Sequence, residues 1–368
     1  MFESIRVSMG GPVSEPTKGP RGGETPARRH GKPETAKGTE LHPFAHYLRI
    51  VARGETRSRP LDETEANEAM RMVLRGEAEP VQIGAFLAVL RFRQETAEEI
   101  AGFVRAARAM RPPVEKAKAE LDWPSYADAH RQLPYFALAA LLIAEHGTRV
   151  LMHGIEGAGP ATTVAVLGAL GISLCATPDA AARSLERERF AYLPLGVACP
   201  PLRKLFGLRP ILGLRTGANT IARELNPFGA QYQMQGVFHP NYIEKHRGAA
   251  ERLRQPNAAI FKGGAGEAQR NPQKSCRVVL LRGTKLTEES WPALHDGAPY
   301  AWREEPLDPS RVVALWRGTW AAAVPEAAVV GTAAIALHLL GKVDGPEAAD
   351  RLARELWQKR PKTKYGRG

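Results

Sequence analysis

The apolar residues of this chain change their spacing at Pro112-Pro113, and this change limits the possible folds more than any other feature. Before the two prolines the spacing is helical. Asp62 and Thr96 are each followed three residues later by a glutamate, which is the N-cap pattern of an amphipathic helix. Since proline ends a helix, the sequence predicts a small helical bundle over residues 41–112.

Beyond Pro113, short apolar runs alternate with helical segments. A helix is expected over 160–170, and another opens at Thr177. Four runs predict buried strands: 150–152, 172–175, 258–261 and 278–281. Strands and helices that alternate in this way favour a parallel sheet with right-handed crossovers. We therefore predict an α/β fold class, with a small helical N-terminal bundle and a large α/β domain that has a mainly parallel central sheet.

The domain boundaries follow from the same patterns. Residues 1–40 show no apolar periodicity, so we expect a disordered N-terminal tail. The α/β domain is expected over 113–350, and a segment near 200–225 is expected to return to the helical domain. Residues 351–368 are rich in Lys and Arg and are expected to form a basic C-terminal tail.

The charge of the chain favours a polyanionic partner. It has 51 Lys and Arg against 39 Asp and Glu, a net charge of +12 and an isoelectric point near 9.8. Residues 203–254 alone hold nine Lys and Arg and three Glu. A solvated face remains the alternative explanation for each basic run.

Other sequence features indicate where the protein resides. Residues 1–40 contain no apolar stretch typical of a secretory signal, and the apolar run from Leu133 to Ala144 is too short to cross a bilayer. Cys175, Cys199 and Cys276 lack the spacing of a zinc site or a disulfide framework. We expect a cytoplasmic protein that does not associate with membranes.

Three strings carry a resemblance to a known family. They are LGLRTGAN at 212–219, LNP at 225–227 and QGVFHP at 235–240. They resemble the corresponding run of anthranilate phosphoribosyltransferases, which share a fold with class II nucleoside phosphorylases. His153-Gly154 and the helix that follows agree, and the resemblance spans roughly residues 42–340. It implies the bundle and α/β domain expected above.

The chain departs from the family where the family holds pyrophosphate and magnesium. Its glycine-rich pyrophosphate loop corresponds here to Pro124–Asp128, where proline has no amide to donate and Tyr126 is expected to fill the space of a phosphate. The family's phosphate- and magnesium-binding element corresponds to residues 134–137 of this chain, and the family's magnesium-binding Asp-Glu pair corresponds to Ala268-Gln269. The resemblance therefore implies that these sites are lost, and we expect no catalytic residue, no metal site and no cofactor.

The combination of a retained scaffold and added basic charge is similar to the YbiB-type branch of the family. This resemblance implies a dimer that binds nucleic acids. We predict a homodimer that binds DNA or RNA without sequence preference and has no enzymatic activity. The candidate contact residues are Arg203, Lys204, Arg209, Arg215 and Lys262. The alternative is a glycosyl or phosphoribosyl transferase of this family with an altered substrate, and a scaffold that binds another protein also stays open.

Single residues in these segments have simpler interpretations. His153 lacks a nearby nucleophile in the sequence, so a structural, hydrogen-bonded role is expected. Arg215 is also a candidate for bracing the fold rather than binding. Aromatic residues near the basic runs are candidates for stacking on unpaired bases, with core packing as the alternative. They are Tyr47, Phe206, Phe228, Tyr232 and Tyr242.

Overall fold

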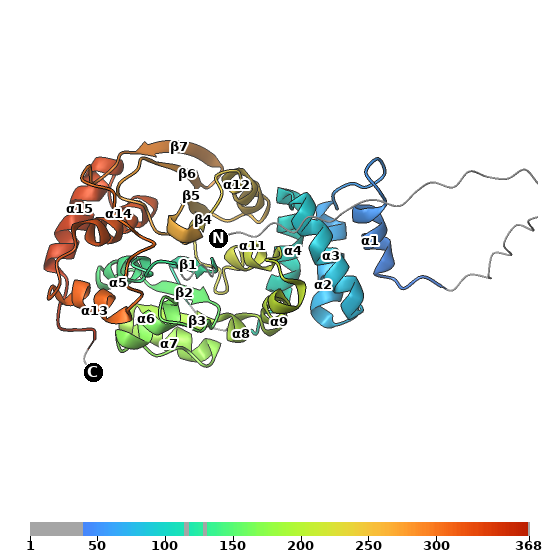
Figure 1. Cartoon of the computed structure of the whole chain (residues 1–368), viewed down its shortest axis with the longest axis horizontal. Helices are drawn as coiled ribbons and strands as arrows, with labels where there is room; N and C mark the ends of the chain where they lie inside the picture. The colour runs from blue at the N-terminus through green and yellow to red at the C-terminus, as the bar shows by residue number, and fades with distance from the viewer. Residues whose placement is uncertain (1–39, 114–117, 128–130, 367–368) are drawn as a thin grey trace, which may run out of the picture. The chain divides into compact units, whose positions relative to one another are not determined.

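The structure is a computed structural model, which describes residues 40–113, 118–127 and 131–366 (Figure 1). The chain divides into two units, Met1–Leu41 and His42–Gly368, and all helices and strands reported below belong to the second. The disordered tail expected for residues 1–40 lies, except for Glu40, outside the described residues.

The N-terminal part of the second unit is a bundle of four helices. They are α1 (Ala45–Ala52), α2 (Glu63–Arg75), α3 (Pro80–Arg93) and α4 (Ala97–Ala109). Asp62 and Thr96 cap α2 and α4, and both capping boxes expected from the sequence are formed. Gly102 lets α2 and α4 pack closely, because a Cβ there would lie 2.4 Å from the carbonyl oxygen of Glu63. The bundle therefore rests on signals that are local in the sequence.

The larger part is built on a seven-stranded sheet in the order β3-β2-β1-β4-β5-β6-β7. The strands are β1 (Leu121–Ser125), β2 (Val150–Gly154), β3 (Phe190–Pro194), β4 (Tyr232–Val237), β5 (Asn257–Lys262), β6 (Cys276–Arg282) and β7 (Lys285–Trp291). The first five pair in parallel, and β6 and β7 are antiparallel. The predicted fold class, a helical bundle with a mainly parallel α/β domain, is confirmed.

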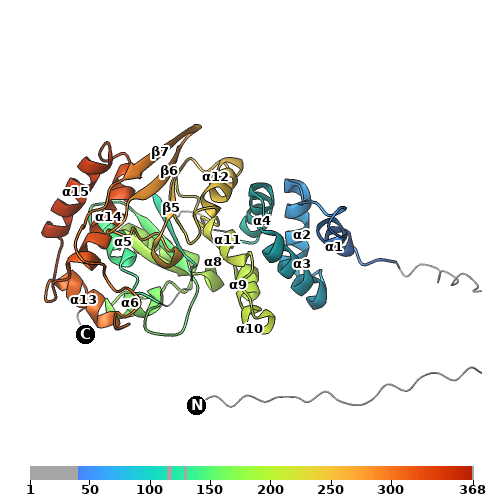
Figure 2. The same ribbon diagram turned by 45° about the horizontal axis from the view of Figure 1, so that its top comes forward.

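Helices cover both faces of this sheet. The remaining ones are α5 (Phe136–Glu145), α6 (Thr163–Ala169), α7 (Pro178–Glu188), α8 (Leu195–Ala198), α9 (Pro200–Phe206), α10 (Arg209–Leu212), α11 (Ala218–Arg223), α12 (Tyr242–Arg252), α13 (Pro309–Arg317), α14 (Ala323–Leu339) and α15 (Pro346–Lys359). One face packs against α5, α13, α14 and α15, and Figure 2 shows α14 and α15 side by side. The other face packs against α7, α8, α9 and the bundle. Trp123 belongs to the first core and Leu151 to the second, so each layer has its own hydrophobic core.

β1, β3, β4 and β7 were not among the strands expected from the sequence, and three expected segments differ in the structure. The run 172–175 is not a strand, because the described structure pairs it with β3 only through a hydrogen bond from the Cys175 amide to the Tyr192 carbonyl. The helix expected over 160–170 begins at Thr163, where the Thr162 hydroxyl provides the N-cap. The expected basic tail is helical as far as Lys359, since the Trp357 ring is buried against Trp316.

Candidate functional site

The strand order places a crevice at the carboxyl ends of β1 and β4. The chain runs from β1 outward to β2 and β3, and then returns to add β4 on the other side of β1. In open α/β sheets, ligands bind where the strand order reverses in this way. Ser125, Gly154 and Val237 are the last residues of β1, β2 and β4 and therefore lie at this edge. The topology of the sheet alone therefore determines where the candidate site lies.

A glutamate closes the turn that follows β1. The backbone amide of Ala127 donates to Glu267 Oε1 at 2.7 Å, and the Ser125 hydroxyl lies 3.5 Å from the same oxygen. Glu267 can reach this turn because its backbone crosses β4 at Gly236, where a Cβ would lie 2.2 Å from the Glu267 carbonyl oxygen. A carboxylate of the chain therefore takes the amide that a bound anion would use. Asp128 and the two residues after it lie outside the described residues.

The space beside Glu267 is small and polar. It is a cavity of about 40 Å³, and its polar lining comes from Ser125, Gln132, Thr162, Thr163, Glu267 and Gln269. Glu267 Oε2 is buried there without a hydrogen-bond partner among the described residues. Burial raises the pKa of the Glu267 carboxyl, and the nearby Arg223 guanidinium acts to lower it. An anion from solvent would have to compete with a carboxylate that is already in place.

Tyr126 does not fill this space, contrary to the expectation from the sequence. Its ring is fully buried on the other face of β1, and its hydroxyl lies 2.7 Å from His153 Nδ1. His153 Nε2 lies 3.0 Å from Asp122 Oδ1, which leaves Nδ1 to accept from the tyrosine hydroxyl. The Ala127 amide is occupied by the Glu267 carboxylate and not by Tyr126. The structural, hydrogen-bonded role expected for His153 agrees with these contacts.

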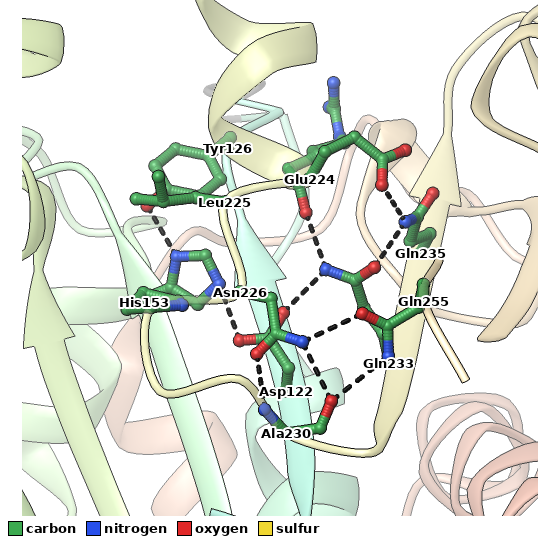
Figure 3. A network of polar contacts seen from close by, with 12 residues as sticks. Asp122, Tyr126, His153, Glu224, Leu225, Asn226, Ala230, Gln233, Gln235 and Gln255 are labelled. Atoms are coloured by element: carbon green, nitrogen blue, oxygen red, sulfur yellow. Dashed lines mark hydrogen bonds and ion pairs between the residues drawn. The ribbon is translucent and has the colours of Figure 1, made fainter. Parts of the chain in front are cut away.

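The buried chain of polar groups continues from Asp122 to α12 (Figure 3). Gln233 Nε2 donates to Asp122 Oδ2 at 2.8 Å, and Gln235 Nε2 donates to Gln233 Oε1 at 2.7 Å. Gln235 Nε2 also donates to Glu224 Oε2 at 2.7 Å, and Glu224 Oε1 lies 2.6 Å from His246 Nδ1. Because each of these buried side chains bonds to the next, the network fixes β1, β2, β4, α11 and α12 relative to one another.

Basic side chains gather in two hollows, the second of which is lined in part by His246 of this network. The first has a volume of about 170 Å³, and Arg203 and Arg209 are in its wall. The second has a volume of about 110 Å³, with Arg215 in its wall. Both hollows are lined by Thr216 and Asn219, so they adjoin. The structure thus brings together three of the five residues predicted to contact nucleic acid.

These three arginines differ in their surroundings. Arg203 Nε donates to Glu156 Oε2 at 2.8 Å, so part of its charge is already compensated. Arg209 is exposed, and Arg215 is half-buried. Burial lowers the pKa of Arg215, and the charge of Arg209 adds to this effect. Arg209 is therefore the more accessible contact for a phosphate.

Lys204 and Lys262 do not join this group. Both are exposed, and neither lines the two hollows. Two arginines that the sequence reasoning missed, Arg91 and Arg223, line the second hollow. Arg223 ends α11 and lies in the same basic run as Arg215, whereas Arg91 comes from α3 in the bundle, far from that run in the sequence.

The described part of the chain offers neither a metal-binding cluster nor a membrane span. Within residues 40–113, 118–127 and 131–366, no group of three or more His, Cys, Asp or Glu is arranged to hold a metal ion. In the same residues, no helix is both long and apolar enough to span a bilayer. Gln269, at a position where the family resemblance implies a metal-binding acid, accepts a hydrogen bond from the Phe136 amide at 2.8 Å.

Comparison with known proteins gives concordant results. Models described as "Glycosyl transferase family, helical bundle domain" and "Glycosyl transferase family, a/b domain" match residues 45–110 and 136–295. Anthranilate phosphoribosyltransferase 2 of Streptomyces coelicolor is 33% identical over 329 residues, 82% of this chain and 97% of that protein. The uncharacterized protein YbiB of Escherichia coli is 28% identical over 245 residues, 65% of this chain and 76% of that protein. The crystal structure of anthranilate phosphoribosyltransferase from Thermus thermophilus has a TM-score of 0.70 and 26% identity, and covers 84% of this chain and 94% of that one.

Proposed function

Since this chain belongs to the anthranilate phosphoribosyltransferase family of glycosyl transferases, we propose that it uses the scaffold of that family to bind nucleic acid at its two adjoining hollows. The observation that carries the proposal is the convergence of Arg209, Arg215 and Arg223 around Thr216 and Asn219. Guanidinium groups bind phosphate oxygens through directed hydrogen bonds. Fold alone does not decide function, so the residues at the site carry the argument.

Binding of this kind is expected to be independent of sequence. Phosphate contacts position a nucleic acid but do not identify its bases. The chain has a net charge of +12, and each phosphate that it neutralises releases counterions and adds to affinity. The proposal includes both DNA and RNA, because a phosphate contact does not distinguish them.

The turn after β1 supports the proposal because it disfavours the binding of a pyrophosphate, which the alternative function requires. A pyrophosphate placed there would meet the Glu267 carboxylate, which already accepts from the Ala127 amide. Like charges at hydrogen-bond distance in a partly buried site oppose binding. Gln269 has no charge with which to hold a metal that would screen this repulsion.

The second candidate is a glycosyl or phosphoribosyl transferase with an altered substrate. The extent of the likeness favours it, because the Streptomyces anthranilate phosphoribosyltransferase is matched over 97% of its length. Taken by themselves, the comparisons support this candidate better than nucleic-acid binding. The cavity at the switch point, with Ser125 and Thr163 in its wall, is where such an enzyme would hold its donor.

We also propose that the protein is a cytoplasmic homodimer. Val81 on α3 and Ile211 on α10 are apolar side chains with exposed fractions of 78% and 77%. They are on neighbouring segments, because a Cβ on Gly84 would lie 3.6 Å from the Leu212 side chain. A contiguous exposed apolar patch marks a face covered by another protein, and we propose that these two side chains contribute to such a face.

Two titrations on one preparation separate the candidates. The first measures fluorescence anisotropy of labelled 20-nucleotide DNA and RNA of unrelated sequences. The second measures, by calorimetry, the binding of phosphoribosyl pyrophosphate with Mg²⁺. The proposal expects similar affinity for all the oligonucleotides and no heat of binding for the donor. Donor binding that depends on Mg²⁺, without oligonucleotide binding, would overturn nucleic-acid binding and favour the transferase instead.

A further inference from the structure

The second hollow combines positive charge with an exposed aromatic ring. Its walls include Arg91 from α3, Arg215 and Arg223 around α11, and Phe238 and Tyr242 after β4. None of its described lining residues is acidic. The charges of Glu95, Glu224 and Glu267 act on these groups, but none of the three residues lines the hollow. The hollow is therefore positive, although its three arginines come from distant parts of the sequence.

Arg223 is the most recessed of these arginines. Its Nη2 donates to the carbonyl oxygen of Gly266 at 3.2 Å, and its Nη1 lies 3.5 Å from that of Asn219. Burial lowers the pKa of Arg223, whereas the Glu267 charge raises it and the Arg215 charge lowers it further. A recessed guanidinium bonded to neutral carbonyls gains from an additional anion.

Phe238 lies at the mouth of this hollow with 54% of its surface exposed. Its ring packs edge-on against His239, with centroids 4.8 Å apart. Behind it, Gly266 approaches closely, since a Cβ there would lie 3.0 Å from Phe238 Cβ. One face of the chain thus holds an aromatic ring toward solvent beside three guanidinium groups. Aromatic rings beside a basic groove are how single-strand binders hold unpaired bases.

The two hollows together form a path for a chain rather than a site for one small anion. Thr216 and Asn219 separate the second hollow from the first, which holds Arg209. An unpaired strand can place one phosphate at each hollow and turn a base onto Phe238. A duplex keeps its bases stacked inside, so it cannot offer a base face to the Phe238 ring.

We propose that the second hollow binds an unpaired nucleotide of a nucleic-acid chain, with its base stacked on Phe238 and its phosphate held by Arg91, Arg215 and Arg223. This inference rests on the proposed function and specifies its substrate. It gives the protein a preference for single-stranded over double-stranded nucleic acid. The Phe238 ring supplies the preference, and the arginines supply affinity for phosphate.

The test compares Phe238→Ala with wild type. Fluorescence anisotropy measures the affinity of the full chain for a labelled 20-nucleotide strand and for the same strand annealed to its complement. Loss of one stacked base should weaken binding of the single strand by about 5- to 150-fold and leave duplex binding unchanged. Phe238→Tyr should retain the affinity of the wild type. Leu286→Ala on β7, which removes a side chain that is 42% exposed, is the control and should change neither affinity.

A second variant checks the phosphate contact. Arg91 is exposed, so Arg91→Ala should fold normally and lower the slope of log affinity against log salt by about 0.7 for the single strand. The inference is overturned if Phe238→Ala weakens strand and duplex equally or weakens neither, and also if adenosine monophosphate binds as tightly as the strand. Those results leave the proposed function in place, whereas a wild type that binds no nucleic acid overturns both.

Discussion

The Glu267 carboxylate accepts a hydrogen bond from the backbone amide of Ala127, across the switch point between β1 and β4. The two residues are 140 positions apart in the sequence. This contact places an anion of the protein itself at the end of β1. The proposed function depends on this contact, because the carboxylate would repel a pyrophosphate at the same place.

Glu267→Gln is expected to make the protein more stable at neutral pH. Burial raises the pKa of the Glu267 carboxyl above its ordinary value of 4.5, so the folded state holds this proton more tightly than the unfolded state. Stability due to this group therefore falls as the pH rises from about 4.5 through the folded-state pKa. Glutamine can still accept from Ala127 and does not titrate. Urea unfolding at pH 4 and pH 8 should show a difference from wild type only at pH 8; an equal difference at both would contradict the assignment.

Tyr126→Phe should destabilise the fold through His153. The substitution removes the buried hydroxyl 2.7 Å from His153 Nδ1 and leaves that nitrogen without a partner, at a cost of about 1–3 kcal/mol. The matched control is Tyr192→Phe. Its buried hydroxyl only reaches the Ile155 carbonyl at 3.4 Å, so the loss should be about 1 kcal/mol or less. Equal losses in the free energy of unfolding would mean that the Tyr126–His153 contact contributes nothing specific.

Glu156→Gln is expected to strengthen nucleic-acid binding. Glu156 accepts from Arg203 at 2.8 Å on the wall of the first hollow, so removal of its charge frees a guanidinium for phosphate. One additional contact should increase the magnitude of the salt slope by about 0.7–0.9. The measurement is the anisotropy titration at several salt concentrations. A weaker affinity than wild type would show that Glu156 orients Arg203 for binding instead.

The apolar face of α3 and α10 should hold the dimer together. The double variant Val81→Lys/Ile211→Lys places charges at two exposed apolar positions and should give a monomer in sedimentation velocity at micromolar concentration. Its thermal stability as a monomer should change little, because neither side chain is buried in the chain itself. Leu286→Lys, which also adds a charge at an exposed leucine, should remain dimeric. If the double variant is still a dimer, the interface lies elsewhere on the protein.

Local signals in the sequence identified the helical bundle and three of the seven strands of the sheet, β2, β5 and β6. The capping boxes at Asp62 and Thr96 form because their partners lie within one helical turn. Buried strands were also recognisable, since runs such as 258–261 are short, apolar and bounded by turns. The run 172–175 has the same character but adds no strand, because apolar content alone does not determine whether a segment pairs with its neighbours.

The site was only partly predictable for a physical reason. Arg203, Arg209 and Arg215 lie within one basic segment, and the structure keeps them near each other. Arg91 reaches the same place from α3, and no pattern within either segment encodes that approach. The same holds for Glu267, whose contact with Ala127 depends on the crossing of β4. Contacts that depend on topology become visible only when the sheet order is known.

The most direct test of nucleic-acid binding at the hollows is the salt dependence of the Arg209→Ala variant, with Lys204→Ala as the matched control. Both side chains are exposed, so the melting temperature of each variant should stay at the wild-type value. Because Arg209 lines the first hollow and Lys204 lines neither, Arg209→Ala should lower the slope of log affinity against log salt by about 0.7–0.9 for unrelated sequences alike. Lys204→Ala should leave the slope unchanged. An unchanged slope in folded Arg209→Ala would contradict the account.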